Sequence, residues 1–124
     1  RTAEFLESQD AVEFVNYPGL KQNKYHALAQ KYLPKGCCGV ISFSIKGGRE
    51  RAAAFIDHLK MVSLEVHVAD IRTCILHPAS STHRQLTDEQ LVNCGITPGL
   101  IRLSCGIEHI DDILEDLTQA FAQI

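Results

Sequence analysis

The 124-residue chain lacks the features that would place it in a membrane or on a nucleic acid. No apolar run approaches the ~20 residues that a membrane-spanning helix needs, and no stretch has the pattern of a secretory signal peptide. Neither sign of charge dominates, because 12 Lys and Arg residues face 15 Asp and Glu residues, a net charge of -3. We therefore expect neither a nucleic acid nor a membrane surface as a partner.

Cysteine pairs with the spacing of a metal site are also absent. The five cysteines are Cys37, Cys38, Cys74, Cys94 and Cys105. No two of them form a CxxC pair, which argues against a zinc site. Their odd number and the 45% apolar content argue against a secreted disulfide framework. We expect packed, reduced thiols in a cytoplasmic protein.

The signatures of common enzyme classes are incomplete. Gly47 and Gly48 in IKGGRE lack the spacing of a Walker loop or a Rossmann fingerprint. In HPASSTH, Ser80 or Ser81 could pair with His83 as nucleophile and base, but the glycines of a nucleophile elbow are missing. No two histidines have the helical spacing of a metal site. The residues alone therefore show no complete catalytic set.

What the sequence does contain is a regular alternation of amphipathic helices and short strands. The predicted helices cover 3–9, 24–32, 49–59, a segment headed by Thr87 and ended by Gly95, and a segment from His109 to the end. The predicted strands cover 12–15, 39–45, 62–68, 73–76 and 100–105.

Two of these patterns carry specific expectations. In the helix at 24–32, Tyr25, Leu28, Ala29 and Tyr32 share one face, which predicts a buried stripe. In 62–68, every second residue is Val or Leu, which predicts a full strand. Helices with one apolar stripe and strands with one apolar face indicate two layers, a sheet with helices on one side. The periodicity leaves the strand order open.

Arg102 is a permanent cation in the middle of an apolar strand. Leu100, Arg102 and Ser104 share one face, whereas Ile101 and Leu103 share the other, which we expect to be core. Arg102 should therefore point away from the helices. Its position alone leaves two roles open. The commoner one is a surface ion pair, worth about 0–1 kcal/mol. The other is an anion clamp, because a guanidinium matches a carboxylate bidentately.

Five segments, taken together and in order, resemble one enzyme family. They are VNYPGL, KYLPKG, GVISFSIKGG, ADIRTCILHPASSTH and GLIRLSCGIEHIDDILEDL. The chain resembles, over essentially all of its length, the C-terminal part of the Cys/Met-metabolism family of pyridoxal-phosphate (PLP) enzymes. Within the family it is most similar to O-acetylhomoserine sulfhydrylases, and HPASSTH favours this branch over cystathionine synthases and lyases.

The resemblance implies a fold and a domain organisation. It implies the aspartate aminotransferase-like fold (fold type I), with residues 1–124 as a single C-terminal substrate-binding domain. This domain should be α+β, with two layers: a mainly antiparallel sheet and helices on one face. The cofactor-binding large domain would lie outside this chain, and the helical pattern starting directly at Arg1 also suggests a fragment. An isolated small domain should expose the apolar surface that the large domain covers.

The resemblance also implies site residues. The arginine of the RLS-x-G-x-E segment, here Arg102, would bind the α-carboxylate of the substrate, and a strand holds such a group more rigidly than a loop does. Thr73 would help to hold the same carboxylate through its backbone or hydroxyl group. Ser80 to His83 would line the entrance. No catalytic, cofactor-binding or metal-binding residue is expected in this chain.

The implied function is that of a larger enzyme. The parent would be a PLP-dependent transferase that makes homocysteine or methionine from O-acetylhomoserine and sulfide or a thiol. Its partners would be the small amino-acid substrate and its own large domain, and it would form a homo-oligomer, a tetramer. The family binds PLP through a lysine in a Ser-x-Thr-Lys segment, which this chain lacks, and Lys46 has a different context. We therefore expect this chain alone to be inactive.

Two alternatives remain open at this point. The parent could catalyse a related trans-sulfuration reaction, of the cystathionine γ-synthase or methionine γ-lyase type. The chain could also be a stand-alone, non-catalytic binding or interaction domain.

Overall fold

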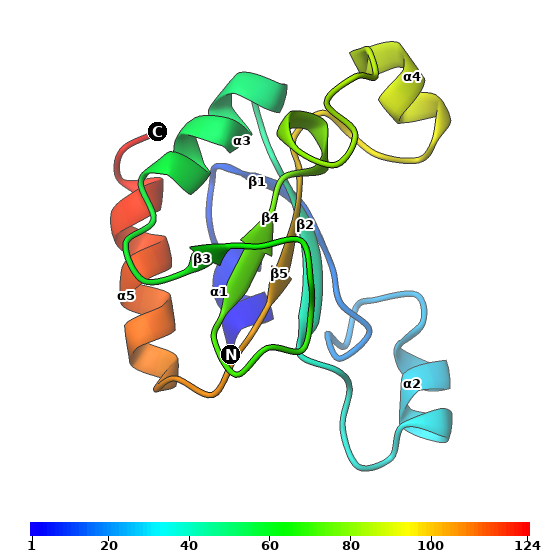
Figure 1. Cartoon of the computed structure of the whole chain (residues 1–124). Helices are drawn as coiled ribbons and strands as arrows, with labels where there is room; N and C mark the ends of the chain where they lie inside the picture. Colours follow the sequence, from blue (N-terminus) through cyan, green and yellow to red (C-terminus); the bar gives the residue numbers. More distant parts are fainter.

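The computed structural model describes all 124 residues and shows a twisted sheet with helices packed on one face (Figure 1). The helices are α1 (Thr2–Glu7), α2 (His26–Tyr32), α3 (Gly48–Asp57), α4 (Asp88–Asn93) and α5 (Ile110–Phe121), with a short 3-10 helix, η1 (Pro78–Ser80). The strands are β1 (Val12–Asn16), β2 (Val40–Ile45), β3 (Ser63–Leu64), β4 (Cys74–Leu76) and β5 (Leu100–Ser104). Thr87 heads α4 as predicted and forms a capping box there, in which Thr87 and Gln90 exchange hydrogen bonds.

The sheet has the strand order β1-β2-β5-β4-β3. Every neighbouring pair is antiparallel except β3 and β4, which are parallel. This topology confirms the expected α+β fold with a mainly antiparallel sheet. It also supplies the strand order that periodicity left open. The last strand of the sequence, β5, inserts between β2 and β4 at the centre of the sheet.

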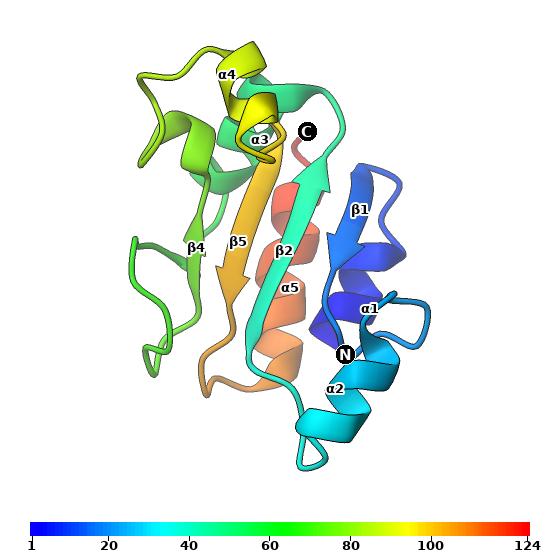
Figure 2. The same ribbon diagram turned by 90° about the vertical axis from the view of Figure 1, so that its right-hand side faces the viewer.

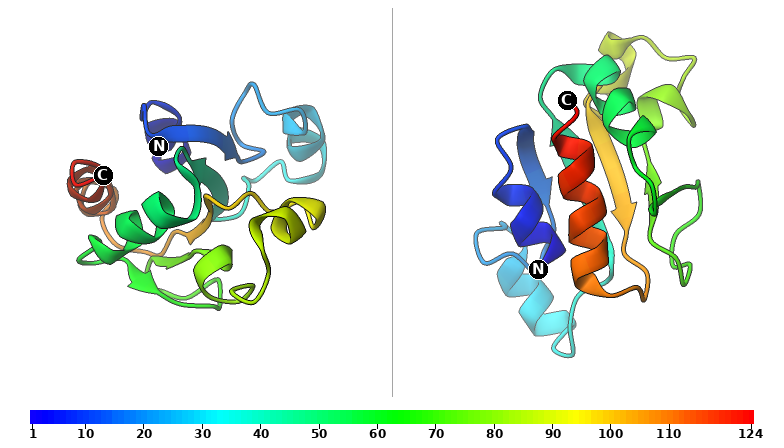
Figure 3. Two further views of the ribbon diagram at one scale, coloured as in Figure 1. Left: turned by 90° about the horizontal axis from the view of Figure 1, so that it is seen from above. Right: turned by 90° about the vertical axis from the view of Figure 1, so that its left-hand side faces the viewer.

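Helices α1, α3 and α5 cover one face of the sheet (Figure 3). Between these layers lies the core, in which the fully buried rings of Phe43 and Phe55 meet edge to face at 6.2 Å. We call the opposite face of β2 and β5 the open face, because no helix crosses it and only α2 and α4 flank its two ends (Figure 2). None of the helices combines the length and the apolar character required to cross a bilayer.

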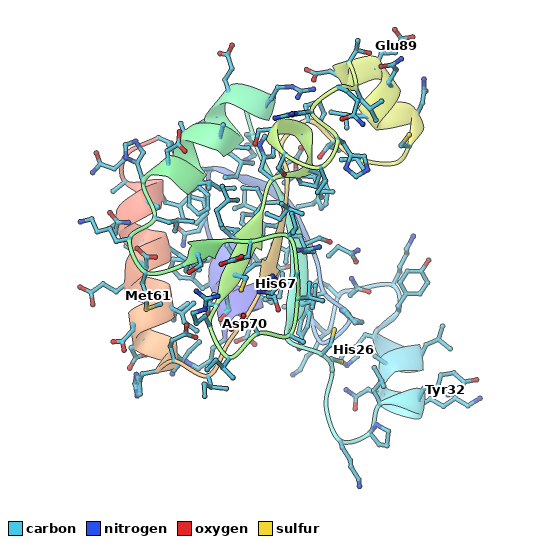
Figure 4. All side chains as sticks on the ribbon, viewed as in Figure 1. His26, Tyr32, Met61, His67, Asp70 and Glu89 are labelled. Carbon is cyan, nitrogen blue, oxygen red and sulfur yellow. The ribbon has the colours of Figure 1, made fainter.

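The predicted buried stripe of the second helix is wrong. Helix α2 forms, but only Ala29 is buried, while Tyr25, Leu28 and Tyr32 are 51%, 51% and 68% exposed. The helix stands away from the sheet, and its Tyr32 points into solvent (Figure 4). An apolar stripe shows that a helix needs a partner surface, but it does not show that the same chain supplies it.

The predicted strand at 62–68 is also wrong over most of its length. Only Ser63 and Leu64 pair, with Cys74 and Ile75 of β4. Beyond Leu64 the chain leaves the sheet, and Val66 and Val68 are exposed. β3 is an edge strand: it has one neighbour, β4, and no strand on its other side that could extend it.

The turn that replaces this strand contains one strained residue. Ala69 is the only non-glycine residue with a positive φ, 62°. Left-handed backbone costs an L-residue about 1–2 kcal/mol, and the greater chain entropy of an unfolded glycine offsets about 0.5–1 kcal/mol of that. We therefore expect Ala69→Gly to raise the free energy of unfolding by roughly 0.5–1 kcal/mol, measured by urea denaturation. Ala53→Gly, inside α3, is the matched control and should instead destabilise.

Candidate functional site

Arg102 lies in the middle of the central strand β5. It pairs with Ser42 of β2 on one side and with Leu76 of β4 on the other. Its neighbours Ile101 and Leu103 are fully buried against the helix layer. The alternation of a strand therefore directs Arg102 to the open face, as the sequence predicted.

The guanidinium of Arg102 is bound to backbone carbonyls and to no carboxylate. Its Nη2 donates to the carbonyl of Val66 at 2.7 Å and to that of His67 at 3.1 Å. Nε is buried and has no partner, and it is the only buried side-chain nitrogen or oxygen in the chain in that state. An unsatisfied buried donor costs about 1–3 kcal/mol, and more when it is charged. The structure thus shows no surface ion pair at Arg102, and its Nε lacks an acceptor.

Residues 65–73, called the 65–73 segment below, include the two carbonyls that bind Arg102. This segment is itself fixed by the residues that follow Arg102 in the RLS-x-G-x-E motif. Ser104, two residues after Arg102, accepts a hydrogen bond at its Oγ from the amide of Ala69 at 3.1 Å. Ser104 is 2% exposed, whereas the bond itself is only partly buried because Ala69 is exposed. It anchors the turn whose carbonyls bind Arg102.

Gly106 and Glu108 fix the other end of the 65–73 segment. Glu108 accepts hydrogen bonds from the amide and from the hydroxyl of Thr73, both at 2.7 Å. The amide of Gly106 donates to the Thr73 hydroxyl at 2.9 Å. A side chain at Gly106 would overlap the carbonyl groups of Ile71 and Arg72, so only glycine allows this close approach.

Thr73 is therefore placed differently from Arg102. It is fully buried, and its amide and hydroxyl are both committed to Glu108. Leu76 of β4 pairs with Arg102 of β5. Thr73 precedes Leu76 by three residues, so it lies about 10 Å from this pair along the strand. The structure does not bring the two predicted site residues together. Thr73 has no free donor for a carboxylate and instead holds the 65–73 segment.

The HPASSTH segment forms a hydrogen-bonded corner rather than a nucleophile–base pair. His77 is fully buried, with Nε2 2.8 Å from the carbonyl of Pro98 and Nδ1 2.9 Å from Ser80 Oγ. Since a carbonyl can only accept, we assign the proton to Nε2. Burial lowers the pKa of His77, which keeps the ring neutral. Ser80 and Ser81 both bond to His77, whereas His83 bonds to Thr82, so the serines are not paired with His83.

Two carboxylates, the half-buried Glu108 and the buried Asp116, should make the stability of the domain depend on acid. Burial raises the pKa of Glu108, but the hydrogen bonds from Thr73 outweigh it and leave this pKa below its ordinary value. The pKa of Asp116 is lowered by the same balance, in which three backbone amides oppose burial. Because both pKa values are lower in the folded state, the unfolded chain binds protons first as the pH falls.

The stabilisation is therefore complete above the unfolded pKa, about 4, and is lost as the pH falls through the folded values. We expect the Tm of the chain to fall between about pH 5.5 and about pH 3. The drop should be smaller in Glu108→Gln, measured by thermal unfolding at a series of pH values. A Tm that rises with acid would contradict the assigned shifts.

Comparison with known proteins assigns a family. Residues 1–122 match the model of the Cys/Met metabolism PLP-dependent enzymes. The O-acetyl-L-homoserine sulfhydrylase of Leptospira meyeri is 47% identical over 125 residues, covering 100% of this chain and 28% of that protein. The homocysteine synthase of Schizosaccharomyces pombe is 45% identical over 118 residues, covering 95% of this chain and 28% of that protein.

Two further relatives extend this picture. The L-methionine gamma-lyase of Fusobacterium nucleatum subsp. polymorphum is 42% identical over the whole of this chain and 31% of its own length. The crystal structure of a protein assigned as an O-acetylhomoserine (thiol)-lyase, from Campylobacter jejuni, matches with a TM-score of 0.86 and 42% identity. It covers 97% of this chain and 28% of its own, and it carries N'-pyridoxyl-lysine-5'-monophosphate. The chain thus spans less than a third of the length of each of these relatives.

Proposed function

Because the chain belongs to the family of Cys/Met metabolism PLP-dependent enzymes, we propose that it is the C-terminal substrate-binding domain of an O-acetylhomoserine sulfhydrylase. The proposed parent replaces the acetoxy group of O-acetylhomoserine with sulfide or a thiol and releases acetate. The products are homocysteine or methionine. Relatives with sulfhydrylase or homocysteine synthase activity in their names, at 47% and 45% identity over nearly the whole chain, support this choice. The five free cysteines of this chain fit the proposed cytoplasmic location.

One observation carries the proposed role of Arg102: its buried Nε lacks any acceptor. The carbonyls of Val66 and His67 occupy only Nη2. A carboxylate is the stronger acceptor, because charge-assisted hydrogen bonds are about twice as strong as neutral ones. We propose that the α-carboxylate of the substrate takes the place of these carbonyls when the 65–73 segment shifts. A strand-borne anchor then fixes the substrate in one orientation.

The cofactor belongs to the part of the parent that lies outside this chain. PLP supplies the electron sink that allows the γ-substituent to leave. All lysines of this chain are exposed, and Lys46 donates to the carbonyl of Asp10 at the end of the sheet. An enclosed PLP site needs a lysine inside a pocket, so the residues present do not fit covalent PLP binding. We propose that the chain alone has no activity.

The large domain of the parent is the proposed partner of the exposed apolar side chains. These include Tyr25 directly before α2, Leu28 and Tyr32 on α2, and Leu64 and Val66 at the end of β3 and just beyond it. Surfaces of this kind on a small domain are typical of an interface. A homotetrameric parent remains part of the proposal.

The test uses the full-length parent loaded with PLP. We expect homocysteine and acetate from O-acetylhomoserine and sulfide, at a higher kcat/KM than any release of methanethiol from methionine. The reverse ranking would favour a methionine γ-lyase, the second candidate that the Fusobacterium relative suggests. Activity of residues 1–124 alone, with added PLP, would contradict the proposed division of labour between the domains.

A further inference from the structure

Three side chains with different donor atoms converge beside the start of β4. A ring nitrogen of His67, a carboxylate oxygen of Asp70 and the Sγ of Cys74 all lie within 4.8 Å of one another. No other trio of His, Cys, Asp or Glu side chains in the chain lies so close together. Figure 4 shows His67 and Asp70 on the loop in front of the sheet.

We propose that His67, Asp70 and Cys74 form a binding site for a zinc-class divalent cation. Nitrogen, oxygen and sulfur donors of these types all bind zinc, at about 2.0–2.3 Å. Tetrahedral coordination at those lengths puts the donor atoms about 3.3–3.8 Å apart, so the cluster needs only a small adjustment. Three protein donors leave the fourth position for water or another ligand.

The backbone of the turn already orients two of the three donors. Asp70 Oδ1 accepts from the amide of Arg72 at 2.9 Å, and Oδ2 faces His67 Nε2 at 2.9 Å. Ala69, in its left-handed conformation, lies in the turn between His67 and Asp70. The contact between Oδ2 and the imidazole would be replaced by two bonds to the cation.

A second carboxylate lies where the outer shell of a metal-bound histidine requires one. Glu65 Oε2 is 3.7 Å from His67 Nδ1, the ring nitrogen that is not directed at Asp70. Histidine ligands commonly donate this second N–H to a carboxylate, which fixes the tautomer and the ring orientation. The backbone of Glu65 is fixed too, because its amide donates to the carbonyl of Ile75 at 3.0 Å.

Arg72 and Cys74 set the requirements for binding. The guanidinium of Arg72 lies 3.4 Å from Asp70 Oδ2 and 3.3 Å from Glu65 Oε1, and its side chain is 54% exposed. A cation at Asp70 would shift this group onto Glu65, at little cost for so exposed an ion pair. Cys74 is fully buried and forms the floor of the site. It would bind as a thiolate, with its proton released to solvent.

The experiment titrates the full, reduced 124-residue chain with Co²⁺, a spectroscopic substitute for zinc. We expect one ion per chain, visible bands of tetrahedral cobalt and a near-ultraviolet thiolate-to-cobalt band. Cys74→Ser should abolish the thiolate band, and Glu65→Gln should weaken binding by about 10- to 100-fold. Cys94→Ser is the matched control, because Cys94 is exposed and follows α4, and it should leave the spectrum unchanged.

Two outcomes would overturn the site. One is Co²⁺ binding without a thiolate band, or with a band that survives Cys74→Ser. The other is unchanged affinity in His67→Asn, a variant that should fold normally because this side chain is 48% exposed. Both results come from titrating the chain alone, without substrate, so this test and that of the proposed function fail independently.

Discussion

Replacing Arg102 by methionine in the full-length parent should lower kcat/KM for O-acetylhomoserine by about 10- to 150-fold. A hydrogen bond to a charged group is worth about 1.5–3 kcal/mol, and each 1.4 kcal/mol corresponds to a factor of ten. Methionine retains an apolar stem but removes every donor of the guanidinium. The buried Nε, which no group in the chain satisfies, is the reason to expect a large effect.

The split between the two kinetic constants distinguishes anchoring from general damage. Loss of a carboxylate anchor should mainly raise KM. Arg102→Lys should raise KM less than Arg102→Met does, because lysine keeps the charge but not the planar fork. Arg51→Met is the matched control, since the Arg51 guanidinium makes a single 3.4 Å bond to the carbonyl of Lys46. Equal KM values for wild type and Arg102→Met would disprove the anchor.

Asp116→Ala should lower the free energy of unfolding of the chain by about 3 kcal/mol. Asp116 is 6% exposed within α5, and its two oxygens accept from the amides of Lys60, Met61 and Val62, each at 2.9 Å. Each unsatisfied buried amide costs about 1–3 kcal/mol. Only the Val62 bond is fully buried, so water can replace part of the other two.

Urea denaturation of the chain measures this loss. Glu115→Ala is the matched control, because Glu115 is an exposed carboxylate next to Asp116 on the same helix, and it should change the stability little. Asp116→Asn should fall between the two, since it keeps one acceptor oxygen but turns an NH₂ group towards an amide. A loss below about 1 kcal/mol in Asp116→Ala would show that the loop at 60–62 does not depend on this carboxylate.

The fold could be predicted largely because each strand and helix carries its own apolar pattern. Ile41, Phe43 and Ile45 alternate and are all buried, as their spacing predicts. The failures, helix α2 and the segment at 62–68, have patterns of the same quality but no partner surface within this chain. Periodicity identifies the face to be buried, whereas burial itself depends on the tertiary neighbours.

The candidate site could be predicted only in part. The resemblance makes Arg102 a candidate that its position alone leaves open, but the carbonyls of Val66 and His67 that hold it leave no sign in a sequence. A usable signal did exist, because Arg102 and Ser104 lie two residues apart in one strand and so face the same side. Their spacing indicates one shared surface. The sequence could not show that the amide and the hydroxyl of Thr73 both donate to Glu108.

The most direct test of the account is to compare two inhibitors of the full-length parent: norleucine and pentylamine, the same molecule without its carboxylate. If Arg102 holds the carboxylate, Arg102→Met should weaken norleucine by at least about tenfold and leave pentylamine unchanged. If the substitution instead weakens both inhibitors equally, or neither, then Arg102 does not bind the carboxylate.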